Sequence, residues 1–179
     1  MTVGELWFLV VGVDPSTSSA GWCVLGMRRS VGKWQYLESG QCRGEDVPAE
    51  VLDAMPLARA VKVLGVEGMF PGPAKNKQVM PPTFWKMGFM AGLISGKLRG
   101  APGFEGAELW LPEPNEWRDD VGIKRGRRDA VAHRVRRFAE LATGETMAGP
   151  RGGKQDDRAM AVGIAHAAAR RVTWDHADP

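Results

Sequence analysis

Cysteine and histidine are scarce in this sequence: the 179 residues include two cysteines and three histidines. The two cysteines, Cys23 and Cys42, cannot build a disulfide framework, and nothing near them has the spacing of zinc ligands. This composition excludes the disulfide-rich secreted class and the common zinc-binding modules. We therefore expect both cysteines to be ordinary buried or half-buried thiols.

Long apolar runs are also absent, since no stretch holds the roughly 18 unbroken apolar residues that indicate a membrane-spanning helix. The run Leu6–Val13 is too short to span a bilayer, and no basic segment precedes it as in a signal peptide. With 44% hydrophobic and 25% charged residues, the composition is typical of a globular protein. We expect one compact domain over residues 1–179, in the cytoplasm and without a membrane partner.

Net charge is small, at +3, but the basic residues are clustered in one segment. Between residues 124 and 137 the only acid is Asp129, and such clustering favours a polyanionic partner such as nucleic acid. The alternative is a solvated helix face. The basic residues of this segment are Lys124, Arg125, Arg127, Arg128, Arg134, Arg136 and Arg137.

The apolar pattern predicts strands and helices in a mixed order. Period-2 and short apolar runs predict five strands, and 3.6-residue periodicity predicts the helices. Three strands as a meander, followed by units of helix and strand, predict an α/β fold with a five-stranded mixed sheet flanked by helices. The expected strands are Trp7–Val13, Gly21–Met27, Lys33–Glu38, Val61–Glu67 and Ala107–Leu111, and the expected helices are Pro48–Leu57, Thr83–Leu98, Arg127–Leu141 and roughly Asp156–Val172.

The helix expected at residues 83–98 carries Gly88, Gly92 and Gly96 at four-residue steps, which places them along one flat seam. Each glycine costs a helix up to about 1 kcal/mol relative to alanine, so the close approach of another backbone would explain the seam. That backbone belongs either to a second copy of the chain or to this chain's own sheet.

Four acids stand where the expected elements end or begin. Asp14 and Glu67 each follow a buried apolar strand, and Asp156 and Asp157 open the last helix, beside its inward stripe. Taken singly, Asp14 could cap a turn, Glu67 could be a solvated strand end, and Asp156 could cap its helix. Taken together, carboxylates in one cleft would repel each other, and divalent cations would neutralise them. Hard oxygen ligands favour Mg²⁺, or Mn²⁺ in its place.

These residues resemble one family, the RuvC-type Holliday junction resolvases, which have the RNase H-like fold. The segment Val11–Ser16 is similar to the family's opening strand motif, and Glu67 with Phe70 is similar to its E-x-x-F segment. The stretch 117–137 resembles the part of the family that ends in a basic, DNA-facing helix. Residues 154–159 resemble the K-x-D-D helix start of the mitochondrial and poxviral branch, and a phage-encoded member would fit.

The resemblance implies a crossover junction endodeoxyribonuclease that resolves four-way DNA junctions with two metal ions in each active site. It makes Asp14, Glu67 and Asp156 metal ligands and catalytic residues. The family has a further acid three or four residues into the last helix, where this chain has Ala159 and Met160. Asp157 is therefore the expected substitute.

The same resemblance implies a DNA surface and a homodimer, because a four-way junction is two-fold and needs two matched cuts. Helix 83–98 is our candidate for part of the dimer contact, and no nucleotide cofactor is expected. Phe70 would stack on junction bases. Contacts to DNA phosphates would come from Lys75, Lys77, Lys124, Arg125, Arg127, Arg128, Arg134 and Lys154.

Three alternatives stay open at this stage. A related RNase H-like nuclease would cut RNA–DNA hybrid or other branched DNA, and a catalytically silent protein would only bind junctions. An actin-like ATPase module also begins with a strand that ends in Asp. That class needs two related lobes, and the chain has no internal repeat that would supply them.

Overall fold

The structure is a computed structural model that describes residues 7–28, 30–57, 59–68, 82–149 and 155–172. Its centre is a five-stranded sheet in the order β3-β2-β1-β4-β5. Strands β1, β2 and β3 are antiparallel neighbours, whereas β4 runs parallel to both β1 and β5. The strands are β1 (Trp7–Asp14), β2 (Ala20–Arg28), β3 (Gln35–Cys42), β4 (Arg59–Val66) and β5 (Glu108–Trp110).

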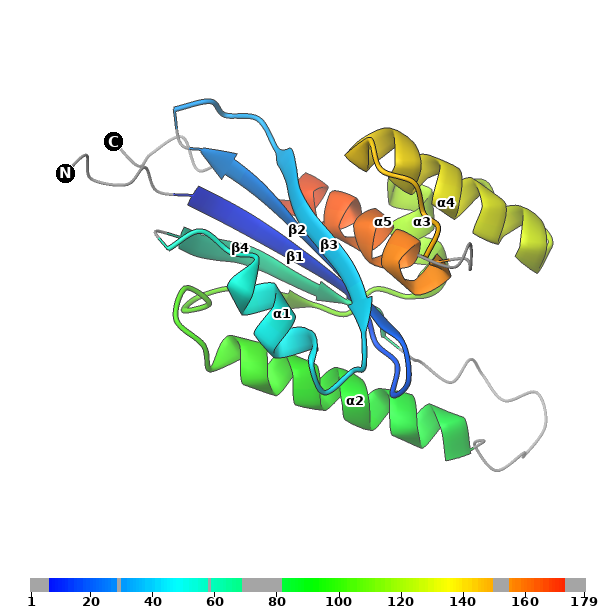
Figure 1. The fold of residues 1–179 in the computed structure, drawn as a ribbon, viewed down its shortest axis with the longest axis horizontal. Coiled ribbons are helices and arrows are strands. Elements are labelled where there is room, and N and C mark those ends of the chain that lie inside the picture. The colour runs from blue at the N-terminus through cyan, green and yellow to red at the C-terminus, as the bar shows by residue number, and fades with distance from the viewer. Residues whose placement is uncertain (1–6, 29, 58, 69–81, 150–154, 173–179) are drawn as a thin grey trace.

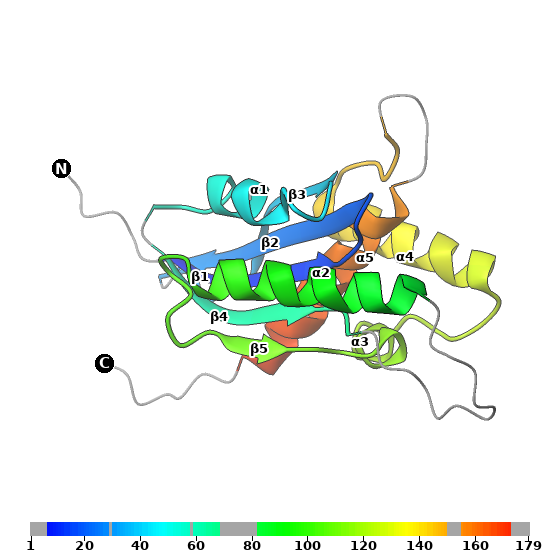
Figure 2. The ribbon, with the colours of Figure 1, turned by 90° about the horizontal axis from the view of Figure 1, so that it is seen from below.

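Helices cover both faces of this sheet. Figures 1 and 2 show α1 and α2 on one face and α5 on the other, with α4 outside α5 and α3 beside it. The expected mixed sheet flanked by helices is therefore confirmed. The helices are α1 (Val47–Asp53), α2 (Pro82–Arg99), α3 (Pro114–Asp120), α4 (Arg128–Thr143) and α5 (Asp156–Arg171).

The alternating side chains of β1 divide between two apolar layers. Leu9, Val11 and Val13 pack toward α1 and α2, whereas Val10 packs toward α5. Because β1 is buried on both faces, its sequence is an almost unbroken apolar run, as in central strands of α/β folds. Cys23 is buried and Cys42 half-buried, both as free thiols, as expected from their number.

Most element boundaries differ from the expectation by one or two residues, and two ends and one helix differ by more. Strand β3 continues to Cys42, because its last residues pair with Gly21 and Ala20 of β2. The first helix ends at Asp53 instead of Leu57, whose side chain is fully exposed. Helix α3 was not expected at all. It begins with Pro114 at its first position and a capping box between Glu113 and Glu116.

Helix α2 presents an apolar face away from the sheet. Met90, Ile94 and Leu98 are buried, yet Trp85 and Phe89 are 69% and 70% exposed. A Cβ atom added at Gly88, Gly92 or Gly96 would meet nothing within 4 Å. Among the described residues, the glycine seam therefore contacts nothing in this chain's own sheet. Packing of the seam on that sheet is excluded as its explanation. No helix in the described part of the chain combines the length and hydropathy needed to cross a bilayer.

Candidate active site

Two buried carboxyls lie together at one edge of the sheet. Asp14 is the last residue of β1, and Glu67 follows β4 directly, with its backbone N–H donating to the carbonyl of Val13 at 2.9 Å. Their side chains are only 9% and 6% exposed. Glu67 is therefore not a solvated strand end. Because β1 and β4 are parallel neighbours, both residues come to the same edge of the sheet.

The start of α5 is held against this edge by close backbone contacts. A Cβ atom at Gly21 would lie 1.9 Å from the carbonyl oxygen of Asp157, so only glycine allows this approach. Gly21 is the register partner of Asp14 across β1 and β2. The Asp157 side chain accepts a hydrogen bond of 2.7 Å from the Ser19 hydroxyl. Packing on Gly21 therefore places Asp157 next to Asp14.

The electrostatics of the site follow from this crowding. Burial, followed by the negative charges of Glu67 and Asp157, raises the pKa of Asp14 well above its ordinary value. Burial also raises the pKa of Glu67, although Asp14, Arg118 and Trp117 oppose part of that rise. A proton shared between the side chains of Asp14 and Glu67 would relieve part of this repulsion and leave the pair with one negative charge.

All four acids expected at the site line one cavity of about 570 Å³. Its wall also holds Arg118, Arg125 and Arg128, so acidic and basic groups face the same space. Arg118 lies over the ring of Trp117, 5.1 Å from its centre. The buried Nε of Arg118 has no hydrogen-bond partner among the described residues. A cavity with both signs of charge suits a phosphate group and the cations that accompany it.

Sequence reasoning missed Arg118 because it missed α3. That helix has seven residues, too few for an apolar period to be visible. The available signals were Pro114 followed by the Glu113 and Glu116 pair, which together mark a helix start.

The other basic residues that were expected to contact DNA lie in different parts of the structure. Arg125, which lines the cavity, pairs with Asp119 at 2.6 Å, and Arg127 precedes the first turn of α4. Arg134 donates to the carbonyl of Lys124 at 2.8 Å, so its guanidinium anchors the loop before α4. Lys124 and Arg134 line a neighbouring groove instead of the acidic cavity. Phe70, Lys75, Lys77 and Lys154 lie outside the described residues.

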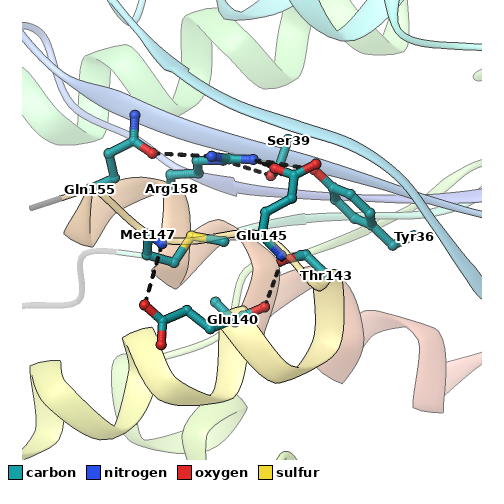
Figure 3. Close-up of polar contacts among 9 residues, drawn as sticks. Tyr36, Ser39, Glu140, Thr143, Glu145, Met147, Gln155 and Arg158 are labelled. Atoms are coloured by element: carbon teal, nitrogen blue, oxygen red, sulfur yellow. Dashed lines mark hydrogen bonds and ion pairs between the residues drawn. The ribbon is translucent and has the colours of Figure 1, made fainter. Parts of the chain in front are cut away.

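Arg158 stands near the place where the resemblance would require a further acid. Figure 3 shows its guanidinium between β3 and the segment that follows α4. It donates to the Ser39 hydroxyl at 2.8 Å, to Tyr36 at 3.3 Å and to Gln155 at 3.1 Å, and it pairs with Glu145. Its side chain is only 12% exposed. Arg158 thus fastens the first turn of α5 to the sheet.

Replacement of Arg158 by alanine is expected to lower the free energy of unfolding by about 2–3 kcal/mol, since several hydrogen bonds to a charged, mostly buried group are lost. For a chain of this size the melting temperature should fall by about 4–12 °C. Calorimetry of this variant beside Glu145→Gln checks the result. Glu145 is 47% exposed and can regain water, so its replacement should cost less than about 1 kcal/mol. Equal losses in both variants would contradict the account.

The resemblance implies divalent cations at this site, and the side chains present suit them in part. No three acidic, histidine or cysteine side chains among the described residues stand close enough to form a complete metal group. Two adjacent buried carboxyls with raised pKa values nevertheless suit a hard cation, which would replace the shared proton. Mg²⁺ usually keeps several waters and takes substrate phosphates as ligands, so an incomplete protein shell fits it.

The sheet order, with acids at the ends of β1 and β4 and at the start of α5, defines the RNase H-like fold class. Solved structures of two resolvases share this fold. Thermus thermophilus RuvC, solved with a Holliday junction substrate, has a TM-score of 0.53 and 18% identity over 90% of this chain and 92% of its own. Fowlpox virus resolvase, solved with Holliday junction DNA, has a TM-score of 0.54 and 10% identity over 92% of this chain and 99% of its own.

Other comparisons found no relatives. No protein-family model matches the sequence, and no curated protein matches it. At such low identity the structural likeness establishes the RNase H-like fold, and the function must be argued from the site.

Proposed function

We propose that this protein is a metal-dependent endodeoxyribonuclease that resolves four-way DNA junctions by paired hydrolysis of phosphodiesters. The observation that carries the proposal is the shared cavity, in which Asp14, Glu67 and Asp157 face Arg118 and Arg128. The likeness to two resolvases whose structures contain Holliday junctions supports the choice of substrate. If these acids only capped helices and ended strands, nothing would explain why they line one cavity.

Each residue has a definite task in this proposal. Asp14 and Glu67 hold the cations, and Glu67 orients the attacking water. Arg118 and Arg128 contact the phosphate that is cut or its neighbour, because both line the same cavity as the acids. When bound, two divalent cations, Mg²⁺ or Mn²⁺, would activate the water and stabilise the leaving oxygen. Lys124, Arg125 and Arg127 position the DNA arms through phosphates.

We further propose that two copies assemble through α2. Trp85, Gly88, Phe89, Gly92 and Gly96 lie on the outward face of this helix, and all five are exposed. A helix that is apolar on both its inward and its outward side is normally buried on both. Glycines with open space above them allow a second helix to approach closely. A dimer would present two active sites to the two opposing strands of a junction.

A substrate panel tests the activity. Purified protein is mixed with a synthetic four-way junction, linear duplex, a flap and RNA–DNA hybrid, each with Mg²⁺, with Mn²⁺ and with EDTA. We expect paired, symmetric nicks on the junction only, in the presence of either cation. Cleavage of hybrid or of other branched DNA would retain the nuclease and replace its substrate. Tight junction binding without any cleavage would identify a silent binding protein instead.

A further inference from the structure

Three consecutive residues at the start of α5 contact three different parts of the molecule. Asp156 pairs with Arg136 of α4, Asp157 accepts from Ser19 after β1, and Arg158 binds Tyr36 and Ser39 of β3. Successive residues of an α-helix point in directions about 100° apart, so two adjacent side chains normally contact different neighbours. The adjacent acids Asp156 and Asp157 therefore differ in their surroundings.

Asp157 belongs to the group of acids at the sheet edge. Its backbone packs on Gly21, the register partner of Asp14. The Ser19 hydroxyl that donates to Asp157 in turn accepts 2.6 Å from the Gln41 side chain, which ties this acid to the connection between β1 and β2 and to β3. One carboxylate oxygen is engaged by Ser19, which leaves the other for a ligand in the cavity.

Asp156 is instead engaged by a cation of the protein itself. Its Oδ1 accepts from Nη1 of Arg136, whose side chain is only 17% exposed, whereas Asp156 is 37% exposed. Arg136 lies in the middle of α4, and the first residue of that helix is Arg128, in the cavity wall. The ion pair thus joins the start of α5 to the helix that carries the basic residues.

We propose that the two adjacent acids have separate tasks: Asp157 is the third carboxylate that joins Asp14 and Glu67 when a cation binds in the cavity, and Asp156 is a positioning residue that acts through Arg136 to hold α4 beside the cavity. This proposal rests on the proposed nuclease function, but its first test needs no DNA. Asp156 is then dispensable for metal binding, contrary to the ligand set that the resemblance implied, and Arg136 is required for the correct placement of Arg128.

The metal test compares Asp156→Asn with Asp157→Asn, which carry the same chemical change one residue apart. The melting temperature is measured in EDTA and with Mn²⁺ at several concentrations. Wild type and Asp156→Asn should both be stabilised by Mn²⁺ with similar midpoints, whereas Asp157→Asn should need at least tenfold more Mn²⁺ for the same shift. A tenfold weaker response in Asp156→Asn, or an unchanged one in Asp157→Asn, would overturn the proposal. So would a wild-type protein that Mn²⁺ does not stabilise.

The positioning test uses junction cleavage by Asp156→Asn, Arg136→Gln and the double variant. If each residue acts only through the other, the double variant should be no worse than either single one. We expect a three- to tenfold rise of KM for the junction in all three, with a smaller change in kcat. Multiplying effects in the double variant would overturn the pairing. If wild type cuts no junction, the proposed function fails, while the Mn²⁺ titration still decides the role of Asp157.

Discussion

Replacement of Asp14 by asparagine is expected to abolish junction cleavage and, at the same time, to stabilise the metal-free protein. The asparagine has the same size and keeps a donor and an acceptor for Glu67, so the packing at the end of β1 should persist. It cannot supply the negative charge that a cation needs. We expect the cleavage rate to fall by at least about 10²–10³-fold while junction affinity in EDTA stays within about threefold.

The gain in stability follows from the raised pKa of Asp14. Because its folded-state pKa lies above the unfolded value, the folded protein binds the proton more tightly, and wild-type stability is lost as pH rises through the folded pKa. The asparagine variant does not lose this stability. Without metal at neutral pH it should unfold about 2–8 °C higher, a gain of about 1–2 kcal/mol. Below about pH 4 both forms are neutral and the difference should vanish.

Two controls separate these effects. Ser39→Ala changes a polar group near α5 but outside the cavity, and it should keep the cleavage rate within about threefold. Mn²⁺ at 100 times its dissociation constant should stabilise wild type by about 2.7 kcal/mol and the asparagine variant far less. A variant that is less stable than wild type at every pH would show that Asp14 is a structural residue, and the site would have to be reassigned.

The sheet and its acidic edge could be predicted because they depend on local patterns. The apolar runs of β1 and β4 end at Asp14 and before Glu67, and parallel neighbours end at the same edge. The inward stripe of the last helix also predicted that Asp156 and Asp157 lie on the side of the sheet, and both line the cavity with Asp14 and Glu67. The close backbone contact between Gly21 and Asp157 was not predicted.

The roles of individual side chains could not be predicted in the same way. Whether Asp156 or Asp157 faces Asp14 depends on the rotation of α5, which is determined by distant residues such as Ser19, Arg136 and Ser39. Arg134 was expected to contact DNA, and in the structure its guanidinium donates to the backbone carbonyl of Lys124 in the loop before α4. The hydrogen-bond and ion-pair partners of such side chains depend on tertiary packing. The periodicity of the sequence does not predict them.

Replacement of Gly92 by glutamate on the outward face of α2 is expected to convert a dimer into a monomer without destabilising the fold. A Cβ atom at Gly92 has open space around it, so glutamate fits the isolated chain. Glutamate is also a better helix former than glycine, by roughly 0.5–1 kcal/mol, and the melting temperature should not fall. At the outward seam, however, a long charged side chain would prevent a second helix from approaching closely.

Light scattering coupled to gel filtration measures the result directly. Wild type should have twice the 19.5 kDa mass of one chain, and the variant the mass of a single chain. Lys97→Glu introduces the same side chain on the flank of the same helix and should remain dimeric. A monomeric wild type, or a dimeric Gly92→Glu variant, would show that α2 is not the dimer contact.

Cleavage by the monomer would then reveal why the assembly matters. In a dimer bound to a junction the second active site is present at an effective concentration in the millimolar range. A monomer at micromolar concentration must find the second strand by a separate encounter, so paired cuts should become about 10²-fold rarer or more, while single nicks persist. Because Gly92 lies on the helix face directed away from the sheet, loss of paired cuts with retention of single nicks would assign the defect to assembly. Loss of both would mean that α2 also supports the active site of its own chain, through Met87 at the cavity wall.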